Sequence, residues 1–60
     1  MKFKDLKQGD YFYYKTGLTI SDRCIRIQNV KPSDRFMINS VNLLTGVAFY
    51  VQEDAEVLKS

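Results

Sequence analysis

Short stretches in which apolar and polar residues alternate with a period of two are the main signal in this sequence, and this period predicts β-strands. The clearest strand is predicted at residues 11–15, where four consecutive aromatic residues combine high β propensity with poor helix propensity. Residues 23–28 also alternate, with Ile25 and Ile27 on one side. Three further strands are predicted at residues 35–43, 47–51 and 56–58.

The segments between these strands carry turn and loop signals. Thr16-Gly17 ends the first strand, and residues 18–20 are either a short continuation of it or part of a loop. Residues 29–34 contain the only proline, Pro32, and are predicted to be a loop. In the third strand the apolar positions change parity, which predicts a bulge or a strong bend near Asn39-Ser40.

The N-terminal segment has a distinct pattern. Helical potential is confined to residues 3–7, because Gly9 ends it within one turn. Phe3 and Leu6 are spaced to hold this segment against the rest of the fold. Gly9 supplies a positive φ for the following turn, where Asp10 can accept hydrogen bonds from nearby backbone amides.

Five short strands joined by Gly, Asp and Asn turns are typical of a small barrel or sandwich. We therefore predict an all-β fold, a five-stranded SH3-like barrel that forms one domain over residues 1–60. In its last hairpin, Gly46 supplies the left-handed conformation, and Asn42 can satisfy backbone groups of the sheet. The main alternative is an open meander that a second subunit completes.

The small size of the chain limits how it can be stabilised. A domain of 60 residues buries little surface and usually needs a disulfide, a metal or a partner subunit. Cys24 is the only cysteine and histidine is absent, which excludes an internal disulfide and a Cys/His zinc site. A well-packed core or self-association remains, and a hydrophobic fraction of 45% is enough for a core.

Charge and targeting signals say little about partners. The net charge of +2 is too weak to diagnose a nucleic-acid binder, although residues 1–52 are mildly basic and residues 53–60 mildly acidic. No apolar run approaches the roughly 20 residues of a membrane span. The N-terminus lacks the apolar stretch of a signal peptide, and the free cysteine fits a reducing compartment. We expect a cytoplasmic protein without a membrane partner, in the host cytoplasm if it is viral.

No catalytic arrangement is found in the sequence. There is no imidazole base, no Gly-rich phosphate loop and no calcium-loop spacing among Glu53, Asp54 and Glu56. Cys24 next to Arg23 is interpreted as a small, partly buried residue rather than a reactive thiol. The sequence therefore predicts no enzymatic activity, no cofactor, no metal and no catalytic residue.

The aromatic run of residues 11–14 is the candidate binding feature. Its side chains alternate, so two point to each face of the sheet, and only one face can be core. Exposed aromatics flanked by arginine suit base stacking, nucleotide binding or a protein interface. The alternative is that the tyrosines only cover a thin core. The predicted partner-binding residues are Tyr11, Tyr13, Tyr14, Lys15, Arg23, Arg26 and Arg35.

Motifs at both ends of the chain resemble those of a set of short, functionally uncharacterised all-β proteins common in bacteriophage genomes. They are Phe3-x-x-Leu6-x-x-Gly9-Asp10, Val41-Asn42-Leu43-x-Thr45-Gly46 and Asp54-x-x-Val57. The resemblance implies a phage accessory protein with an SH3-like fold. It carries over no catalytic residues.

Two functions follow as hypotheses. The first is a protein-interaction module that binds and modulates a host protein and also self-associates. The second is a nucleic-acid or nucleotide binder that uses the aromatic and arginine face. Because residues 11–14 and 36–43 place apolar side chains on both faces of their strands, we also expect a homo-oligomer, most simply a two-fold dimer.

Overall fold

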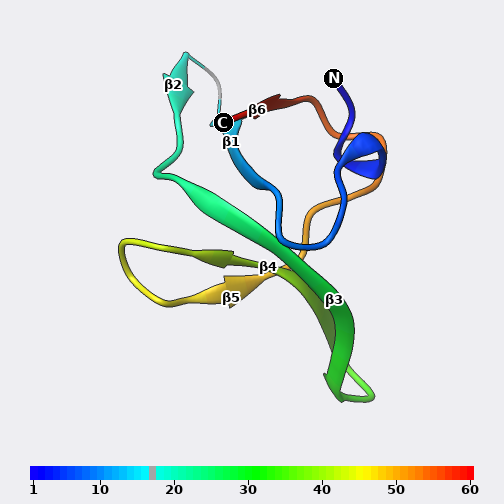
Figure 1. The fold of residues 1–60 in the computed structure, drawn as a ribbon. Helices are drawn as coiled ribbons and strands as arrows, with labels where there is room; N and C mark the ends of the chain where they lie inside the picture. The colour runs from blue at the N-terminus through cyan, green and yellow to red at the C-terminus, as the bar shows by residue number, and fades with distance from the viewer. Residues whose placement is uncertain (17) are drawn as a thin grey trace.

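In the computed structural model, the described part of the chain, residues 1–16 and 18–60, forms one antiparallel β-sheet that curls into a half-barrel (Figure 1). The all-β prediction is confirmed, and no α-helix occurs in this part of the chain. The elements are the 3-10 turn η1 (Phe3–Asp5) and the strands β1 (Tyr11–Thr16), β2 (Thr19–Ile20), β3 (Cys24–Ser33), β4 (Phe36–Asn42), β5 (Ala48–Phe49) and β6 (Val57–Lys59).

The sheet has the strand order β2-β1-β3-β4-β5, with β6 paired to β1. β1 is shared between neighbours: its first residues pair with β3, its middle with β6 and its last residues with β2. Figure 1 shows β1, β6 and both termini at one end of the molecule, while the β3–β4 hairpin projects at the opposite end. The two ends of the sheet therefore differ in how many elements surround them.

The core lies on the inner face of the sheet, beneath the N-terminal segment. The rings of Phe3 and Phe12 meet edge to face, with centroids 5.4 Å apart. Tyr14 and Phe49 pack against this cluster from β1 and β5. Its buried apolar members are Phe3, Leu6, Phe12, Cys24 and Val57. The prediction that Phe3 and Leu6 anchor the N-terminal segment is confirmed.

The predicted turn residues adopt the expected conformations. Gly9 and Gly46 have φ values of 89° and 76°, in the left-handed region that favours glycine. Asp10 Oδ2 accepts a 2.8 Å hydrogen bond from the backbone amide of Lys7. Asn42 Oδ1 accepts hydrogen bonds from two backbone amides of the following turn, at 2.8 and 3.1 Å. The predictions for Gly9, Asp10 and Gly46 are confirmed, whereas Asn42 serves the turn and not the sheet.

All five predicted strands are present, with different lengths. β2 adds a sixth within residues 18–20, for which the sequence predicts either a short strand or a loop. β5 is much shorter than the predicted 47–51, because the Asn39 side chain replaces the sheet pairing after Phe49. Its amide nitrogen donates to the Val51 carbonyl and its amide oxygen accepts from the Val51 N–H, both at 2.9 Å. The predicted break at Thr16-Gly17 includes Gly17, which lies outside the described residues.

Two sequence predictions about β3 and β4 are wrong. Residues 29–34 are not a loop, because β3 continues to Ser33. Pro32 is tolerated there since it lies between Val30 and Ser33, where the ladder with β4 shifts register and needs no regular N–H donor. The predicted bulge at Asn39-Ser40 lies in the facing strand instead, between Arg26 and Val30 of β3.

Candidate functional site

The aromatic run in β1 divides between the two faces as predicted. Phe12 is fully buried and Tyr14 packs against the core. Tyr11 is exposed and Tyr13 is half-buried on the opposite face, which we call the outer face. Because residues directly paired in an antiparallel sheet lie on the same side, the outer face also carries the partners of these residues. Those partners are Ile25, Val41, Ala48 and Leu58.

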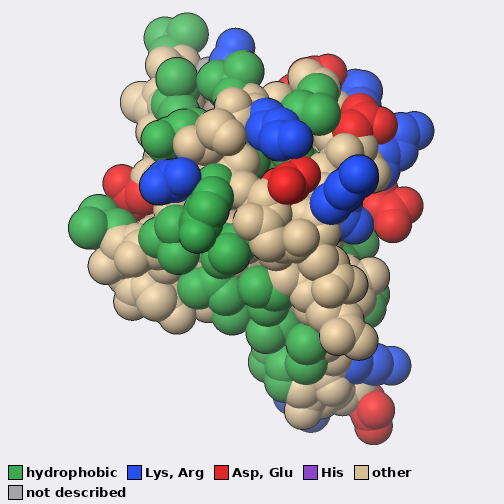
Figure 2. All heavy atoms as spheres, in the orientation of Figure 1, with side chains coloured by type: hydrophobic (Ala, Val, Ile, Leu, Met, Phe, Trp, Pro, Cys, Tyr) green, Lys and Arg blue, Asp and Glu red, His purple; other side chains and the backbone are tan. Residues whose placement is uncertain are grey.

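One predicted arginine lies on the outer face. The guanidinium of Arg23, which precedes β3, sits 4.0 Å from the ring centroid of Tyr11. At this distance a cation–π contact contributes about 0.5–1 kcal/mol at an exposed site. Leu43 lies beside Arg23, since its backbone amide donates to the Arg23 carbonyl. Figure 2 shows hydrophobic side chains gathered in a band over β3 that runs toward the β3–β4 hairpin, with basic groups beside it.

Arg26, another predicted binding residue, has a structural role. Its guanidinium lies on the inner face, 4.6 Å from the ring centroid of Phe3. Its Nη1 donates to the carbonyl of Phe3 at 2.9 Å and also to the carbonyl of Leu6. These carbonyls belong to the chain at and just after η1, where no regular sheet partner is available. Arg26 therefore fixes the N-terminal segment to β3.

The other predicted residues lie elsewhere. The Tyr14 ring contacts Phe49, with centroids 5.4 Å apart. Tyr14 and Lys15 both line a depression of about 380 Å³ between the end of β1, the chain after β5 and Glu56. Arg35 lies at the tip of the β3–β4 hairpin, at the opposite end of the molecule (Figure 1). The predicted set is thus split between the outer face, the inner face and the hairpin tip.

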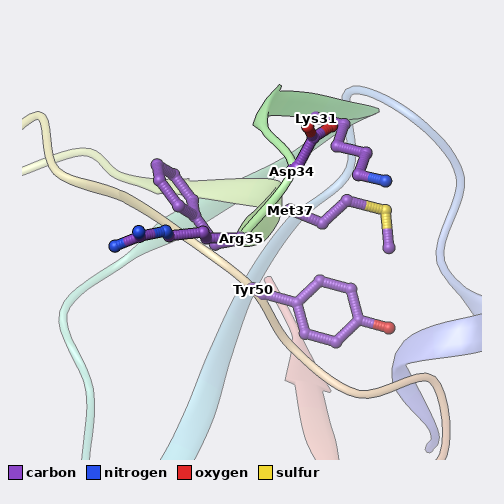
Figure 3. Close-up of a pocket in the computed structure, with 6 residues that line it drawn as sticks. Lys31, Asp34, Arg35, Met37 and Tyr50 are labelled. Carbon is purple, nitrogen blue, oxygen red and sulfur yellow. The ribbon is translucent and has the colours of Figure 1, made fainter.

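A shallow depression at the hairpin was missed by the sequence reasoning. Its volume is about 490 Å³. Lys31, Met37 and Tyr50 extend to the same side of the hairpin, whereas Arg35 extends to the other side (Figure 3). Its lining residues are Lys31, Asp34, Arg35, Phe36, Met37 and Tyr50. The available signal was the absence of any charged residue between Arg35 and Glu53, which is unusual in a chain with 27% charged residues.

The environment of Cys24 gives the thiol no reactive character. Burial raises the pKa of the Cys24 thiol, the Asp22 carboxylate raises it further, and a hydrogen bond with Ser21 opposes both. Cys24 Sγ lies 3.2 Å from the Asp22 carbonyl oxygen, to which it donates. The thiol therefore stays protonated at neutral pH, which suppresses its nucleophilicity.

Residues 1–16 and 18–60 contain neither a cluster of metal ligands nor a membrane-crossing helix. No three Asp, Glu or Cys side chains there gather into a set that could hold a metal ion. Within the same residues, no helix has the length and apolar character needed to cross a membrane.

Comparisons with known proteins give this chain no relatives: no family model matches it, no curated protein matches it, and no solved structure matches its fold. The resemblance to phage proteins therefore stays a prediction.

Proposed function

We propose that this chain is a non-enzymatic protein-binding module and that a partner protein docks on its outer face. The observation that carries the proposal is the exposed stack of Arg23 on Tyr11, bordered by Ile25 and Leu43. Tyrosine and arginine among apolar neighbours are the residue types that dominate binding energy at protein interfaces. The stack also restrains the guanidinium before binding, which lowers the conformational entropy lost on association.

The distribution of positive charge favours a protein over a nucleic acid as the partner. A nucleic acid or nucleotide would require cations along the path of its phosphates. Among the predicted arginines only Arg23 lies on the outer face, because Arg26 binds backbone carbonyls and Arg35 lies at the hairpin tip. Near Tyr11, Lys59 is 3.7 Å from the Asp10 carboxylate, which offsets its charge. A single arginine among apolar residues therefore suits binding to a protein partner better than binding to a nucleic acid.

Two features support a role without catalysis. The sequence contains no histidine to act as a general base. Burial raises the pKa of Cys24, the only thiol in the chain, and so keeps it protonated. We therefore assign the chain a binding role with no cofactor.

The fold and the biological setting belong to the same proposal. We interpret the curled sheet as an incomplete SH3-like barrel, since β6 pairs with β1 while β5 ends the other side of the meander. The motifs at both chain ends resemble phage proteins, so the expected partner is a host protein in the host cytoplasm, which the chain binds and modulates.

The test is capture of proteins from a nuclease-treated bacterial lysate on the immobilised chain. The variants Tyr11→Ala and Arg23→Ala are compared with Arg35→Ala, which removes the same charge from a distant site. We expect bound protein to fall at least tenfold for the first two variants and to stay unchanged for the third. Circular dichroism shows whether each variant is folded.

Equal losses for Arg23→Ala and Arg35→Ala would show that the interaction depends only on charge. Capture that disappears when the lysate is treated with nuclease would favour the nucleic-acid hypothesis. Either result would contradict the assignment of the outer face to a protein partner.

A further inference from the structure

β5 is a sheet edge whose outward backbone groups have no partner in the described residues. Asn42 N–H donates to the Val47 carbonyl, and Phe49 pairs with Ser40, so Val47 and Phe49 direct their backbone groups toward β4. The backbone N–H and C=O groups of successive residues in an antiparallel strand point alternately to its two sides. Ala48 and Tyr50 therefore direct their N–H and C=O groups away from β4, toward the free edge.

The chain around this edge lacks most of the features that protect exposed edges. Natural proteins block such edges with very short strands, charged residues, proline or bulges, and of these β5 has only its short length of two residues. No charged residue occurs between Arg35 and Glu53, and β5 pairs with β4 without a register shift. Large aliphatic side chains flank the edge instead: Leu44 is 75% exposed and Val47 is 60% exposed. Charge depletion with exposed apolar side chains characterises the centre of protein interfaces.

The opposite end of the strand order is β2, which has only two residues, and two further edges are covered or irregular. The outer side of β6 is met by the N-terminus, because Val57 N–H donates to the Met1 carbonyl and Lys2 forms a bridge with Glu56. Beyond Arg26, β3 is interrupted by two register shifts and contains Pro32. A head-to-tail contact in which β5 of one copy pairs with β6 of the next is therefore blocked at the start of β6.

We infer that two copies of this chain form a two-fold dimer by antiparallel pairing of their β5 edges. In this register a two-fold axis at Phe49 places Ala48 of each copy opposite Tyr50 of the other, so that strand pairing extends one residue beyond the end of β5. Both residues then exchange N–H and C=O hydrogen bonds with their counterparts. An isologous contact of this kind closes after two copies and does not form filaments.

The same register covers the exposed aliphatic side chains. Since the two β5 strands are antiparallel, Val47 and Leu44 of one copy extend past Tyr50 of the other. They approach its hairpin depression, which Phe36 and Met37 line. The dimer leaves Tyr11 and Arg23 outside the interface, so it is independent of the proposed partner site.

Disulfide trapping tests the register. In this dimer Val47 of one copy lies opposite Val51 of the other in a non-hydrogen-bonded pair, with Cα atoms about 4.5 Å apart. That distance is within the roughly 4.4–6.8 Å range of disulfides. In a Cys24→Ser background, Val47→Cys with Val51→Cys should form covalent dimers on mild oxidation. Neither single variant should form covalent dimers, because the single cysteine of one copy is about 13 Å along the strands from the same cysteine of the other copy.

Sedimentation of the unmodified chain gives the second readout. We expect twice the 7.0 kDa chain mass at micromolar concentration. Tyr50→Lys should reduce the dimer fraction at least tenfold, while Val30→Lys should not, although Tyr50 and Val30 are 45% and 44% exposed. Circular dichroism verifies folding. A monomer at all concentrations would overturn the inference, and so would a dimer that the double-cysteine variant fails to trap.

Discussion

The two ends of the sheet are built differently. At the end that carries η1, β1 and β6, the buried apolar cluster of the molecule lies inside the sheet, although Tyr11 and Leu58 stay exposed on its surface. At the end formed by β4, β5 and the β3–β4 hairpin, the fully buried residues are polar, namely Asn39 and Ser40. Phe36, 56% exposed, is among the large apolar side chains left on the surface there. We call these the packed end and the open end.

This difference separates stability from binding. Burial of large side chains is the main source of folding free energy, so the packed end supplies it. The open end keeps its order through the β3–β4 ladder and the Asn39–Val51 hydrogen bonds. Its apolar surface contributes to stability only when another surface covers it. Substitutions at the two ends should therefore have opposite consequences for folding and for association.

The largest effect is expected for Phe12→Ala. Removing a fully buried ring costs about 3–5 kcal/mol, which is comparable to the total stability of such a small domain. Urea denaturation should show a largely unfolded variant. Phe36→Ala at the open end is the control and should change the free energy of unfolding of the monomer by about 0.5 kcal/mol or less. Equal effects of the two changes would abolish the distinction between the ends.

A smaller effect is expected for Arg26→Met. The variant keeps the packing of the side-chain stem. It leaves the Leu6 carbonyl without its donor and the Phe3 carbonyl with only the Leu6 N–H, which costs about 1–3 kcal/mol. Arg23→Met is the matched control on the outer face and should cost about 0.5 kcal/mol or less. The same urea titration distinguishes them. If Arg23→Met were the more destabilising, the structural role of Arg26 would be wrong.

Gly46→Val should cost about 1 kcal/mol or slightly more, because a β-branched residue is strained at a φ of 76°. The space around this position is open, so the loss comes from the backbone conformation. Gly46→Asn is the control, since asparagine tolerates the left-handed region. The melting temperature should be highest for wild type, lower for Gly46→Asn and lowest for Gly46→Val. An unchanged melting temperature for Val would show that the turn adopts another conformation.

The smallest effect concerns Glu56, whose pKa is lowered by hydrogen bonds from Lys2 and the N-terminal amine. A depressed folded-state pKa adds stability above the unfolded-state pKa, and this stability is lost as the pH falls through the folded-state value. Glu56→Gln should therefore melt slightly below wild type at pH 7, and the difference should vanish in acid. Because Glu56 is exposed, high salt should also abolish the difference in melting temperature between the variant and wild type. A difference that persists in acid would rule out this ion pair as its cause.

The sequence predicted the features that depend on near neighbours in the chain. Gly9 and Gly46 mark tight turns, and Phe12 has the parity that places it in the core. Pro32 misled the prediction of β3, because proline usually interrupts a strand and here lies where the register shifts. Such a shift depends on the facing strand, which a local pattern does not contain.

The candidate site was harder to predict for the same reason. Arg23 and Arg26 both lie near the aromatic run in the sheet, yet their roles differ. Arg23 stacks on Tyr11, whereas Arg26 donates to backbone carbonyls of the N-terminal segment. Arg35 is separated from both by the length of the β3–β4 hairpin. Their faces and positions depend on contacts between residues that are distant in the sequence.

Amide hydrogen exchange measured at several protein concentrations tests the central claim most directly, because it compares both ends in one experiment. The amide of Phe12 should be protected at every concentration, since it lies in the packed end. The amides of Ala48 and Tyr50 should exchange rapidly in dilute solution and become protected as the concentration rises and the β5 edges pair. Rapid exchange of both amides at all concentrations, in a protein that remains folded, would contradict the account.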